Sequence, residues 1–177
     1  TLNDMMEKNA EMYQWALDNK DFDFVARINA SCYCDKKELI KYTQTLPNEN
    51  VFCGVEVTDA SKGAERWAWG GTQFIFSKDV IQKVVNNRKH FRRDIMEDTA
   101  TSFIINKLGI EYTKGIPSCS IDKSESGWTC ISYIGKSISF TDFADLKDSG
   151  HAFYRVKQDG KRDMDEYVMK QLFQVLK

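Results

Sequence analysis

The chain has 177 residues, of which 42% are hydrophobic and 29% are charged, and its formal net charge is −1 at pH 7. This composition is ordinary for a globular domain with a core of its own. Because basic and acidic residues are mixed along the chain, we expect no nucleic-acid partner. No apolar run approaches the roughly 20 residues that cross a bilayer, so no transmembrane segment is expected.

Hydrophobic periodicity predicts helices and strands in alternation. In chain order they are a helix over 3–18, a strand over 22–28, a helix over 36–45, strands over 51–57 and 72–76, a helix over 78–87, a helix that begins around Glu97 and Asp98 and ends at Gly109, strands over 110–114, 129–134 and 151–157, and a helix over 163–176. Strands separated by helices predict an α/β fold, with a mixed β-sheet flanked by helices on both faces.

One domain is expected over residues 1–177. The chain opens with Thr1 and soon enters a helical pattern, which we interpret as a domain that lacks its N-terminal part. The five cysteines are odd in number, lack the paired spacing of metal ligands and are expected to stay reduced. Because reduced thiols are typical of the cytoplasm, we expect a cytoplasmic protein or a soluble domain of a larger one.

Two adjacent acids, Glu97 and Asp98, stand at the start of a predicted helix. Unpaired backbone N–H groups and the positive end of the helix dipole favour ionised carboxylates at this position. Such a carboxylate can accept a proton from a hydroxyl. Acids in the first turn are also common as helix caps without any chemistry, and the helix alone leaves both interpretations open.

A second group of polar residues, Asn29-Ala30-Ser31, follows the strand expected over 22–28. Ligands of α/β sheets bind at the carboxyl ends of the strands, and we expect this segment to gather there with Asp98. Asn29 and Ser31 can donate hydrogen bonds to a phosphate or a sugar hydroxyl. The alternative is a turn that ends the strand.

Four segments occur in a recognisable order: Arg27–Ser31, Trp69–Asp79, Glu97–Ile110, and His151–Lys157 with the downstream Arg162-Asp163. Together they resemble glycosyltransferases of the GT-A fold, specifically the fringe and β-1,3-galactosyltransferase group and its small microbial relatives. The resemblance covers about residues 20–176, and it implies a GT-A-like three-layer sandwich. It also implies transfer of a sugar from a nucleotide sugar, such as a UDP-sugar, to a hydroxyl of a glycan or another acceptor. The family's first nucleotide-binding strands have no counterpart here.

The resemblance implies that Asp98 is the general base of an inverting transfer. The base takes the proton from the acceptor hydroxyl while the hydroxyl oxygen attacks the anomeric carbon. Glu97 is the alternative base, since a shift of the alignment by one residue exchanges the two acids.

The family usually holds Mn²⁺ or Mg²⁺ with an Asp-x-Asp at the end of a strand, because hard cations prefer carboxylate oxygens. The aligned position here reads Asn29-Ala30-Ser31, whose neutral oxygens bind such a cation less well. Asp21-Phe22-Asp23 matches by its letters, but it stands at the start of the strand, so we interpret it as unrelated. His151 corresponds to a third cation ligand of the metal-dependent relatives.

The remaining donor-binding candidates are Trp69, Gly70, Gly71, Arg155 and Lys157. The glycines admit a close ligand, and the aromatic ring can stack on a sugar; a tight approach to the next strand, with the tryptophan in the core, is the alternative. Arg155 and Lys157 alternate along a predicted strand and therefore share a face that suits a diphosphate. A solvated surface strand is the alternative there.

Two hypotheses of other classes stay open. One is a non-catalytic carbohydrate- or nucleotide-binding module that keeps the fold. The other is a partner-binding domain whose open sheet edge pairs with another segment or chain. The sequence pattern does not select the donor sugar, the acceptor or the linkage, because specificity depends on the shape of the pocket.

Overall fold

The computed structural model describes residues 5–58, 66–71, 73–156 and 162–177. Within them, five α-helices and ten strands form an α/β structure, which confirms the expected class. None of the described helices is long and apolar enough to cross a membrane. The chain divides into two compact units: the first comprises Thr1–Arg27, Leu46–Gly70 and Phe74–Lys114, and the second comprises Ile28–Thr45, Gly71–Gln73 and Gly115–Lys177.

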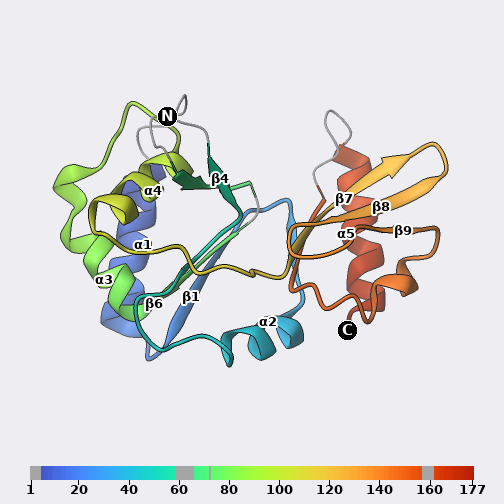
Figure 1. Ribbon diagram of the computed structural model, residues 1–177, viewed down its shortest axis with the longest axis horizontal. Coiled ribbons are helices and arrows are strands. Elements are labelled where there is room, and N and C mark those ends of the chain that lie inside the picture. Colours follow the sequence, from blue (N-terminus) through green and yellow to red (C-terminus); the bar gives the residue numbers. More distant parts are fainter. Residues whose placement is uncertain (1–4, 59–65, 72, 157–161) are drawn as a thin grey trace. The chain divides into compact units, whose positions relative to one another are not determined.

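The first unit combines three α-helices with two small sheets in its described part. Its elements are α1 (Met5–Asn19), β1 (Phe24–Ile28), β3 (Phe52–Cys53), β4 (Glu56–Thr58), β5 (Arg66–Ala68), β6 (Gln73–Ser77), α3 (Lys78–Asn86), a 3₁₀ turn (Arg88–His90) and α4 (Glu97–Lys107). Strand β6 lies between β1 and β3 and is antiparallel to β3, while β4 and β5 form an antiparallel pair. In Figure 1, α1, α3 and α4 lie together on one side of β1 and β6.

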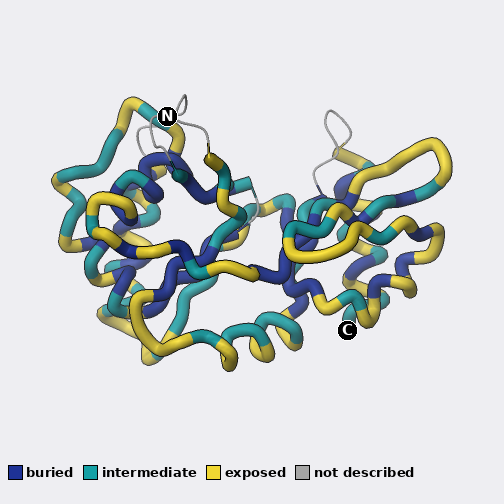
Figure 2. Tube along the Cα trace, in the orientation of Figure 1, coloured by how far each residue is buried: buried dark blue, intermediate teal, exposed yellow. Residues whose placement is uncertain are grey.

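The core of the first unit forms around β6, all five residues of which are buried. A central strand covered on both faces reads as a continuous apolar run and not as an alternating one. The rings of Phe74 and Phe76 contact that of Phe52 at centroid distances of 5.6 and 5.1 Å. Helix α3 adds four buried side chains at spacings of one, three and four residues, namely Val80, Ile81, Val84 and Val85. Figure 2 shows these buried stretches in dark blue.

The second unit is a five-stranded mixed sheet with a helix packed against it. Its elements are β2 (Cys32–Cys34), α2 (Lys36–Thr43), β7 (Ser118–Ser124), β8 (Gly127–Ser132), β9 (Ile138–Phe140), a 3₁₀ helix (Phe143–Leu146), β10 (Phe153–Arg155) and α5 (Arg162–Val175). The strand order is β2-β10-β7-β8-β9. Strand β10 is parallel to β7, and the other neighbours are antiparallel.

Alternation along β7 and β8 gives the second unit its core. Cys119, Ile121, Trp128 and Cys130 are buried at every second position and pack in one cluster with Tyr154 of β10. Two buried residues of α5, one turn apart, complete the cluster, namely Val168 and Leu172. The opposite positions of β7 and β8 are polar or exposed, so the apolar side of this hairpin faces α5.

Several expected elements differ from the structure. The strand expected over 51–57 is divided into β3 and β4 at Gly54, where a methyl group would lie 2.5 Å from the Cβ of Ala68. The strand expected over 110–114 is wrong: that segment makes only an isolated bridge between Thr113 and Cys53. The described strands form three sheets, where the periodicity predicted one mixed sheet.

The C-terminal helix is confirmed, but its expected inner face is partly wrong. Val168 and Leu172 are buried as expected. Tyr167 and Phe173, expected on the same face, are 48% and 55% exposed. Residues 168 and 172 are four apart and share one stripe, whereas 167 and 173 lie at its two borders.

Candidate functional site

Glu97 and Asp98 are the first two residues of α4, as the sequence predicts. Both side chains are buried, at 6% and 9% exposure. One oxygen of Asp98 accepts a hydrogen bond from the Gly70 N–H at 3.0 Å, and the other accepts from the Thr99 N–H at 2.8 Å and the Thr99 hydroxyl at 3.4 Å. These donors come from the helix start and from a distant loop, so they fix the orientation of the carboxylate.

Gly70 is required at its position by space. A methyl group added to it would lie 2.6 Å from the Cβ of Asp98 and 3.3 Å from its carboxylate carbon. The segment before the glycine is held to α4 by Ser102, whose hydroxyl accepts from the Ala68 N–H at 2.9 Å and donates to the Asp98 carbonyl at 2.8 Å. Gly70 is therefore pinned against the first turn of the helix.

Arg27, at the end of β1, joins these two segments. Its guanidinium donates to the Gly70 carbonyl and to Glu97, at 2.7 Å each. Asn9 of α1 donates to the other Glu97 oxygen at 2.5 Å. We call these five residues the Arg27 cluster: Asn9, Arg27, Gly70, Glu97 and Asp98. They come from four segments of the first unit and meet at the start of α4.

The electrostatics of the Arg27 cluster are those of a buried ion pair. The side chains of Arg27 and Glu97 are 13% and 6% exposed. Burial raises the pKa of the Glu97 carboxyl, the Asp98 charge raises it further, and Arg27 and Asn9 oppose this shift. Neither charge of such a pair can be removed alone without leaving the other uncompensated.

Tyr13 adds a polar atom to the same buried region. It lies one turn after Asn9 on α1, and its ring contacts that of Phe76 at 5.4 Å. Burial raises the pKa of its hydroxyl, and the Glu97 charge raises it too. The hydroxyl oxygen is buried and has no hydrogen-bond partner within the described residues. Sequence reasoning missed both Asn9 and Tyr13, although their positions three and seven residues after the buried Met6 place them on the inner side of the helix.

Asn29 and Ser31 belong to the second unit, whereas Asp98 belongs to the first. The Asn29 side-chain oxygen accepts from the Ser31 N–H at 3.0 Å, which is the turn that the sequence left as an alternative. The Ser31 hydroxyl accepts from Arg162 at 3.3 Å. Because the amide oxygen is engaged in the turn and no carboxylate belongs to this segment, these residues do not fit a Mn²⁺ or Mg²⁺ site.

The Asp21-Phe22-Asp23 segment precedes β1, as expected. Asp21 and Asp23 are exposed, and Asp21 lies 3.8 Å from the Lys78 ammonium group. This arrangement is that of solvated surface acids, and we assign it no cation.

Trp69 is half-buried and donates its backbone N–H to the Val55 carbonyl at 2.8 Å. The neighbouring Trp67 is buried in β5, so the core position belongs to Trp67. Gly71 follows at intermediate exposure. Arg155 is half-buried in β10, opposite Cys32 and Ser120 of the adjacent strands. Lys157 lies outside the described residues.

His151 stands two residues before β10, because the strand is shorter than expected. Its ring is buried; Nε2 lies 2.9 Å from the Ser132 hydroxyl and Nδ1 lies 4.0 Å from the Cys130 sulfur. A hydrogen bond from the Cys119 thiol, together with the His151 ring, lowers the pKa of the Cys130 thiol, whereas burial raises that of Cys119. The soft sulfur neighbours of His151 differ from the oxygen ligands that the resemblance implies.

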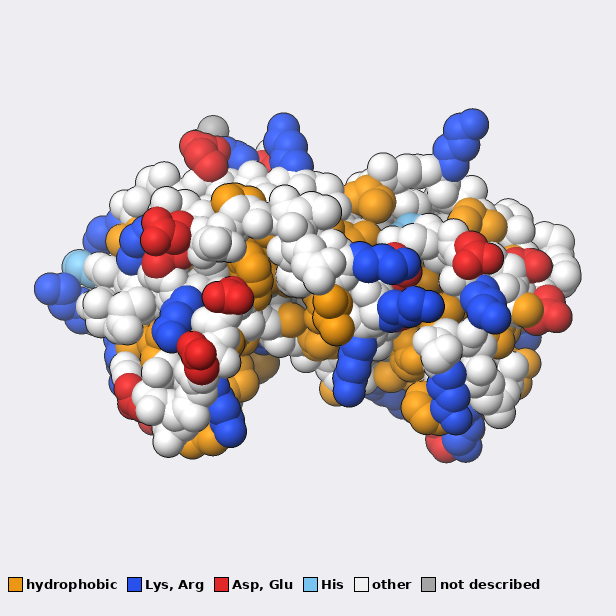
Figure 3. Space-filling model, turned by 90° about the horizontal axis from the view of Figure 1, so that it is seen from below, with side chains coloured by type: hydrophobic (Ala, Val, Ile, Leu, Met, Phe, Trp, Pro, Cys, Tyr) orange, Lys and Arg blue, Asp and Glu red, His pale blue; other side chains and the backbone are white. Residues whose placement is uncertain are grey.

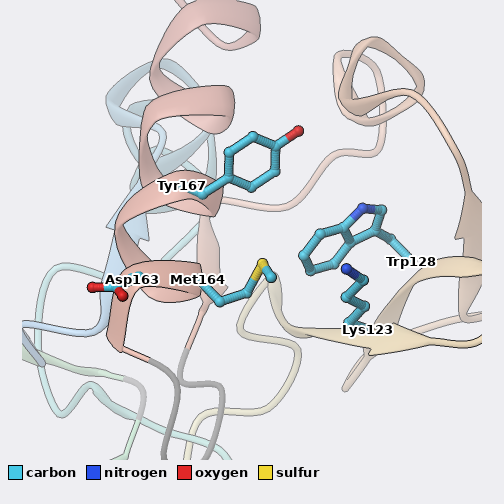
Figure 4. A pocket seen from close by; sticks show the side chains of 5 residues that line it. All are labelled: Lys123, Trp128, Asp163, Met164 and Tyr167. Carbon is cyan, nitrogen blue, oxygen red and sulfur yellow. The ribbon is translucent and has the colours of Figure 1, made fainter.

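The second unit also holds an open pocket of about 400 Å³, lined by Lys123, Trp128, Asp163, Met164 and Tyr167. Figure 4 shows the rings of Trp128 and Tyr167 on opposite walls, with Met164 below them and Lys123 beside Trp128. The ring centroids are 6.4 Å apart with an interplanar angle of 23°. The Lys123 ammonium group lies 5.6 Å from the Trp128 ring. An apolar floor with charged groups at its border suits a small polar ligand that has an apolar face.

On the face drawn in Figure 3, basic and acidic side chains are interspersed over both units. No protein-family model matches the chain. A comparison with curated protein sequences likewise yields no significant match.

Proposed function

We propose that the chain is an inverting glycosyltransferase domain of the GT-A type that moves a sugar from a nucleotide sugar to a hydroxyl acceptor. One observation carries the proposal. The resemblance rests on four segments, and the Arg27 cluster brings three of them into contact through Arg27, Gly70 and the Glu97–Asp98 pair. These segments are 43 and 28 residues apart, and their contacts lie at the acid to which the resemblance gives the chemistry.

Asp98 acts as the general base in this proposal. The acceptor oxygen forms a bond to the anomeric carbon, the bond from that carbon to the nucleotide diphosphate breaks, and the hydroxyl proton passes to the Asp98 carboxylate. A carboxylate offers about four lone-pair positions. Among the described residues three donors bond to the Asp98 oxygens, and in this proposal the acceptor hydroxyl takes the fourth position.

Arg27 and Glu97 act as positioning residues. The Arg27 guanidinium donates a hydrogen bond to the Gly70 carbonyl, and the N–H of the same glycine donates to the Asp98 carboxylate. Gly70 is therefore the one residue that links Arg27 to the base. Glu97 balances the guanidinium charge inside the unit. The Asp98 carboxylate is thereby held in one orientation before any substrate binds, which is how a catalytic group is preorganised.

The test is release of nucleotide from a panel of UDP- and GDP-sugars in the presence of hydroxyl acceptors. Asp98→Asn should lower kcat by about 10²- to 10⁴-fold, the range for loss of a general base. Asp79→Asn is the matched control, because Asp79 also lies in the first turn of a helix and also accepts a distant backbone N–H, that of Asn50 at 3.1 Å. It should retain full turnover. Equal turnover of the two variants, with both folded, would contradict the role of Asp98.

A second candidate is the non-catalytic carbohydrate-binding module, and the pocket of Figure 4 favours it. Trp128 and Tyr167 offer ring faces that stack on the apolar side of a sugar. The Lys123 ammonium group at the border (Figure 4) can donate hydrogen bonds to its hydroxyl groups. In this candidate the pocket binds a glycan and the chain releases no nucleotide from any donor.

Glycan binding separates the two candidates. Tyr167→Ala should weaken binding of an oligosaccharide panel at least tenfold, whereas Phe173→Ala should leave it unchanged. Phe173 is the matched control because it is an exposed aromatic residue of the same helix that does not line the pocket. Glycan affinity that depends on Tyr167 in a chain without turnover would establish the module and overturn the transferase. Equal affinities of the two variants would show that the pocket is not the glycan-binding site of the module.

A further inference from the structure

Three ligand-bearing side chains converge in the second unit, outside the Arg27 cluster. They are Cys119 of β7, Cys130 of β8 and His151 before β10, with exposures of 0%, 0% and 4%. Their ligand atoms all lie within 4.8 Å of one another. In the register of the hairpin, Cys119 pairs with Ser132 and Cys130 with Ile121, so the two cysteines are diagonal neighbours on the same buried face.

We propose that Cys119, Cys130 and His151 bind one thiophilic divalent cation, Zn²⁺ being the ion that this ligand set suits best. Cys₂His with a fourth, non-protein ligand is a known coordination set for zinc. Bonds of about 2.0–2.3 Å place ligand atoms less than about 4 Å apart around one ion. The three groups need only small side-chain rotations from their present separation to reach it.

The charge balance of the proposed site fits its burial. With water as the fourth ligand, two thiolates and a neutral imidazole offset the two charges of Zn²⁺, and a neutral assembly can be buried without an uncompensated charge. Each cysteine gives up its thiol proton on binding, so two protons are released for each ion. A monovalent cation such as Cu⁺ would leave a net negative charge in the same buried place.

The surroundings of His151 orient it as a ligand. Its Nε2 lies 2.9 Å from the Ser132 hydroxyl, which leaves Nδ1, the nitrogen on the Cys130 side, for the ion. Ser132 is itself held, since its oxygen accepts from the Gly135 N–H at 3.1 Å. Because a hydroxyl oxygen has two lone pairs, a proton on His151 Nε2 would take the place of the longer contact from the Ile134 N–H at 3.3 Å. A hydrogen bond from the second ring nitrogen to a fixed oxygen is the usual support of a metal-bound histidine.

The test is metal content and metal titration of the whole chain, and it does not depend on the glycosyltransferase proposal. Protein purified without chelator should carry about one zinc per chain. The metal-free protein should take up one equivalent of Co²⁺ and develop the thiolate-to-cobalt charge-transfer band together with the intense visible bands of tetrahedral cobalt. Zn²⁺ added in competition should remove both signals.

Matched variants keep the proposal falsifiable. Cys130→Ser should abolish the charge-transfer band or reduce Zn²⁺ affinity at least 100-fold. Cys53→Ser, which changes an equally buried cysteine outside the cluster, should leave both unchanged. Ser132→Ala keeps all three ligands, removes the hydrogen-bond partner of His151 and the acceptor of the Ile134 and Gly135 N–H groups, and should weaken Zn²⁺ binding by about 10- to 100-fold.

Two results would overturn the proposal. One is a Co²⁺ spectrum without thiolate bands in the folded, reduced protein. The other is a count of titratable thiols in the freshly purified, denatured chain that is two lower than the number of cysteines, where Cys119→Ser removes this deficit. A disulfide between Cys119 and Cys130 would then occupy the place of the ion.

Discussion

The Gly70 amide donates a hydrogen bond to the Asp98 carboxylate at 3.0 Å, and the Gly70 Cα faces the Asp98 Cβ with no room for a methyl group between them. The two residues are 28 positions apart. The glycine thus serves both as the donor that orients the acid and as the space that the acid fills. A substitution at either residue therefore changes the packing and the hydrogen bonding of the other.

Gly70→Ala should destabilise the first unit by about 1–3 kcal/mol, the usual effect of an added methyl group in a filled space. The new Cβ would lie 2.6 Å from the Asp98 Cβ, which is fixed to the helix backbone and cannot rotate away. Gly135→Ala is the control, because its nearest neighbour would be the Ser132 hydroxyl at 3.8 Å, and it should stay within about 0.5 kcal/mol of the wild type. Urea unfolding of both variants measures the difference; equal midpoints would refute the close contact.

Arg27→Met should lower the free energy of unfolding by about 3–5 kcal/mol, because it leaves the buried Glu97 charge without its partner. The double variant Arg27→Met/Glu97→Gln should be more stable than Arg27→Met alone, since the second change removes the stranded charge. The control pair is Arg92 and Asp94, with exposures of 38% and 64%; Arg92→Met should change stability by less than about 1 kcal/mol. Strict additivity in the Arg27–Glu97 cycle would show that the two side chains are not coupled.

The free energy of unfolding should depend on pH through the titration of the Glu97 carboxyl. Its pKa is raised in the folded state above the ordinary value of 4.5, so the folded chain binds more protons than the unfolded chain just above that value. The contribution of the Glu97 carboxyl to the free energy of unfolding is therefore complete below pH 4.5 and is lost as the pH rises through the pKa of the folded state. Urea unfolding of the wild type and of Glu97→Gln between about pH 4 and pH 7 measures it. The difference in stability should fall with rising pH, and a difference that grows would contradict the direction of the shift.

Asp35→Ala should destabilise the second unit by about 1 kcal/mol through the start of α2. One Asp35 oxygen accepts from the N–H groups of Lys37 and Glu38 at 2.9 and 3.2 Å, which makes it the cap of that helix. Asp35→Asn keeps an acceptor oxygen and should keep most of this stability. Thermal unfolding of the two variants separates capping from charge, because a charge effect would destabilise both equally.

Local signals in the sequence were sufficient to predict the positions of the helices and to place the acidic pair at the start of α4. The cap at Asp35 marks the start of α2, and the apolar spacing from Val80 to Val85 marks α3. The strand β7 was missed because the positions that alternate with Cys119 and Ile121 are serine and aspartate, so its apolar signal is confined to two residues. Propensity is weak for such half-exposed strands, whose pairing is decided by their neighbours.

The contacts of the candidate sites depend on pairs that are distant in the sequence. Asn9 reaches Glu97 over 88 residues, and the Cys130–His151 approach spans 21 residues and the turn before β10. Spacing rules for metal ligands assume that the ligands share a loop or a helix. Here each ligand comes from a different segment: the register of β7 and β8 brings the two cysteines together, and the pairing of β10 with β7 brings His151 beside them.

The place of β10 in its sheet has a consequence for folding during synthesis. This strand, at Phe153–Arg155, fills the gap between β2, which is made early, and β7, which is made late. Until the ribosome has delivered it, β2 and the outer side of β7 are open edges that can pair with other chains. Contacts over such a separation also form slowly. A nascent or truncated chain that ends before Phe153 should therefore aggregate readily and depend on chaperones, whereas the finished chain closes the gap itself.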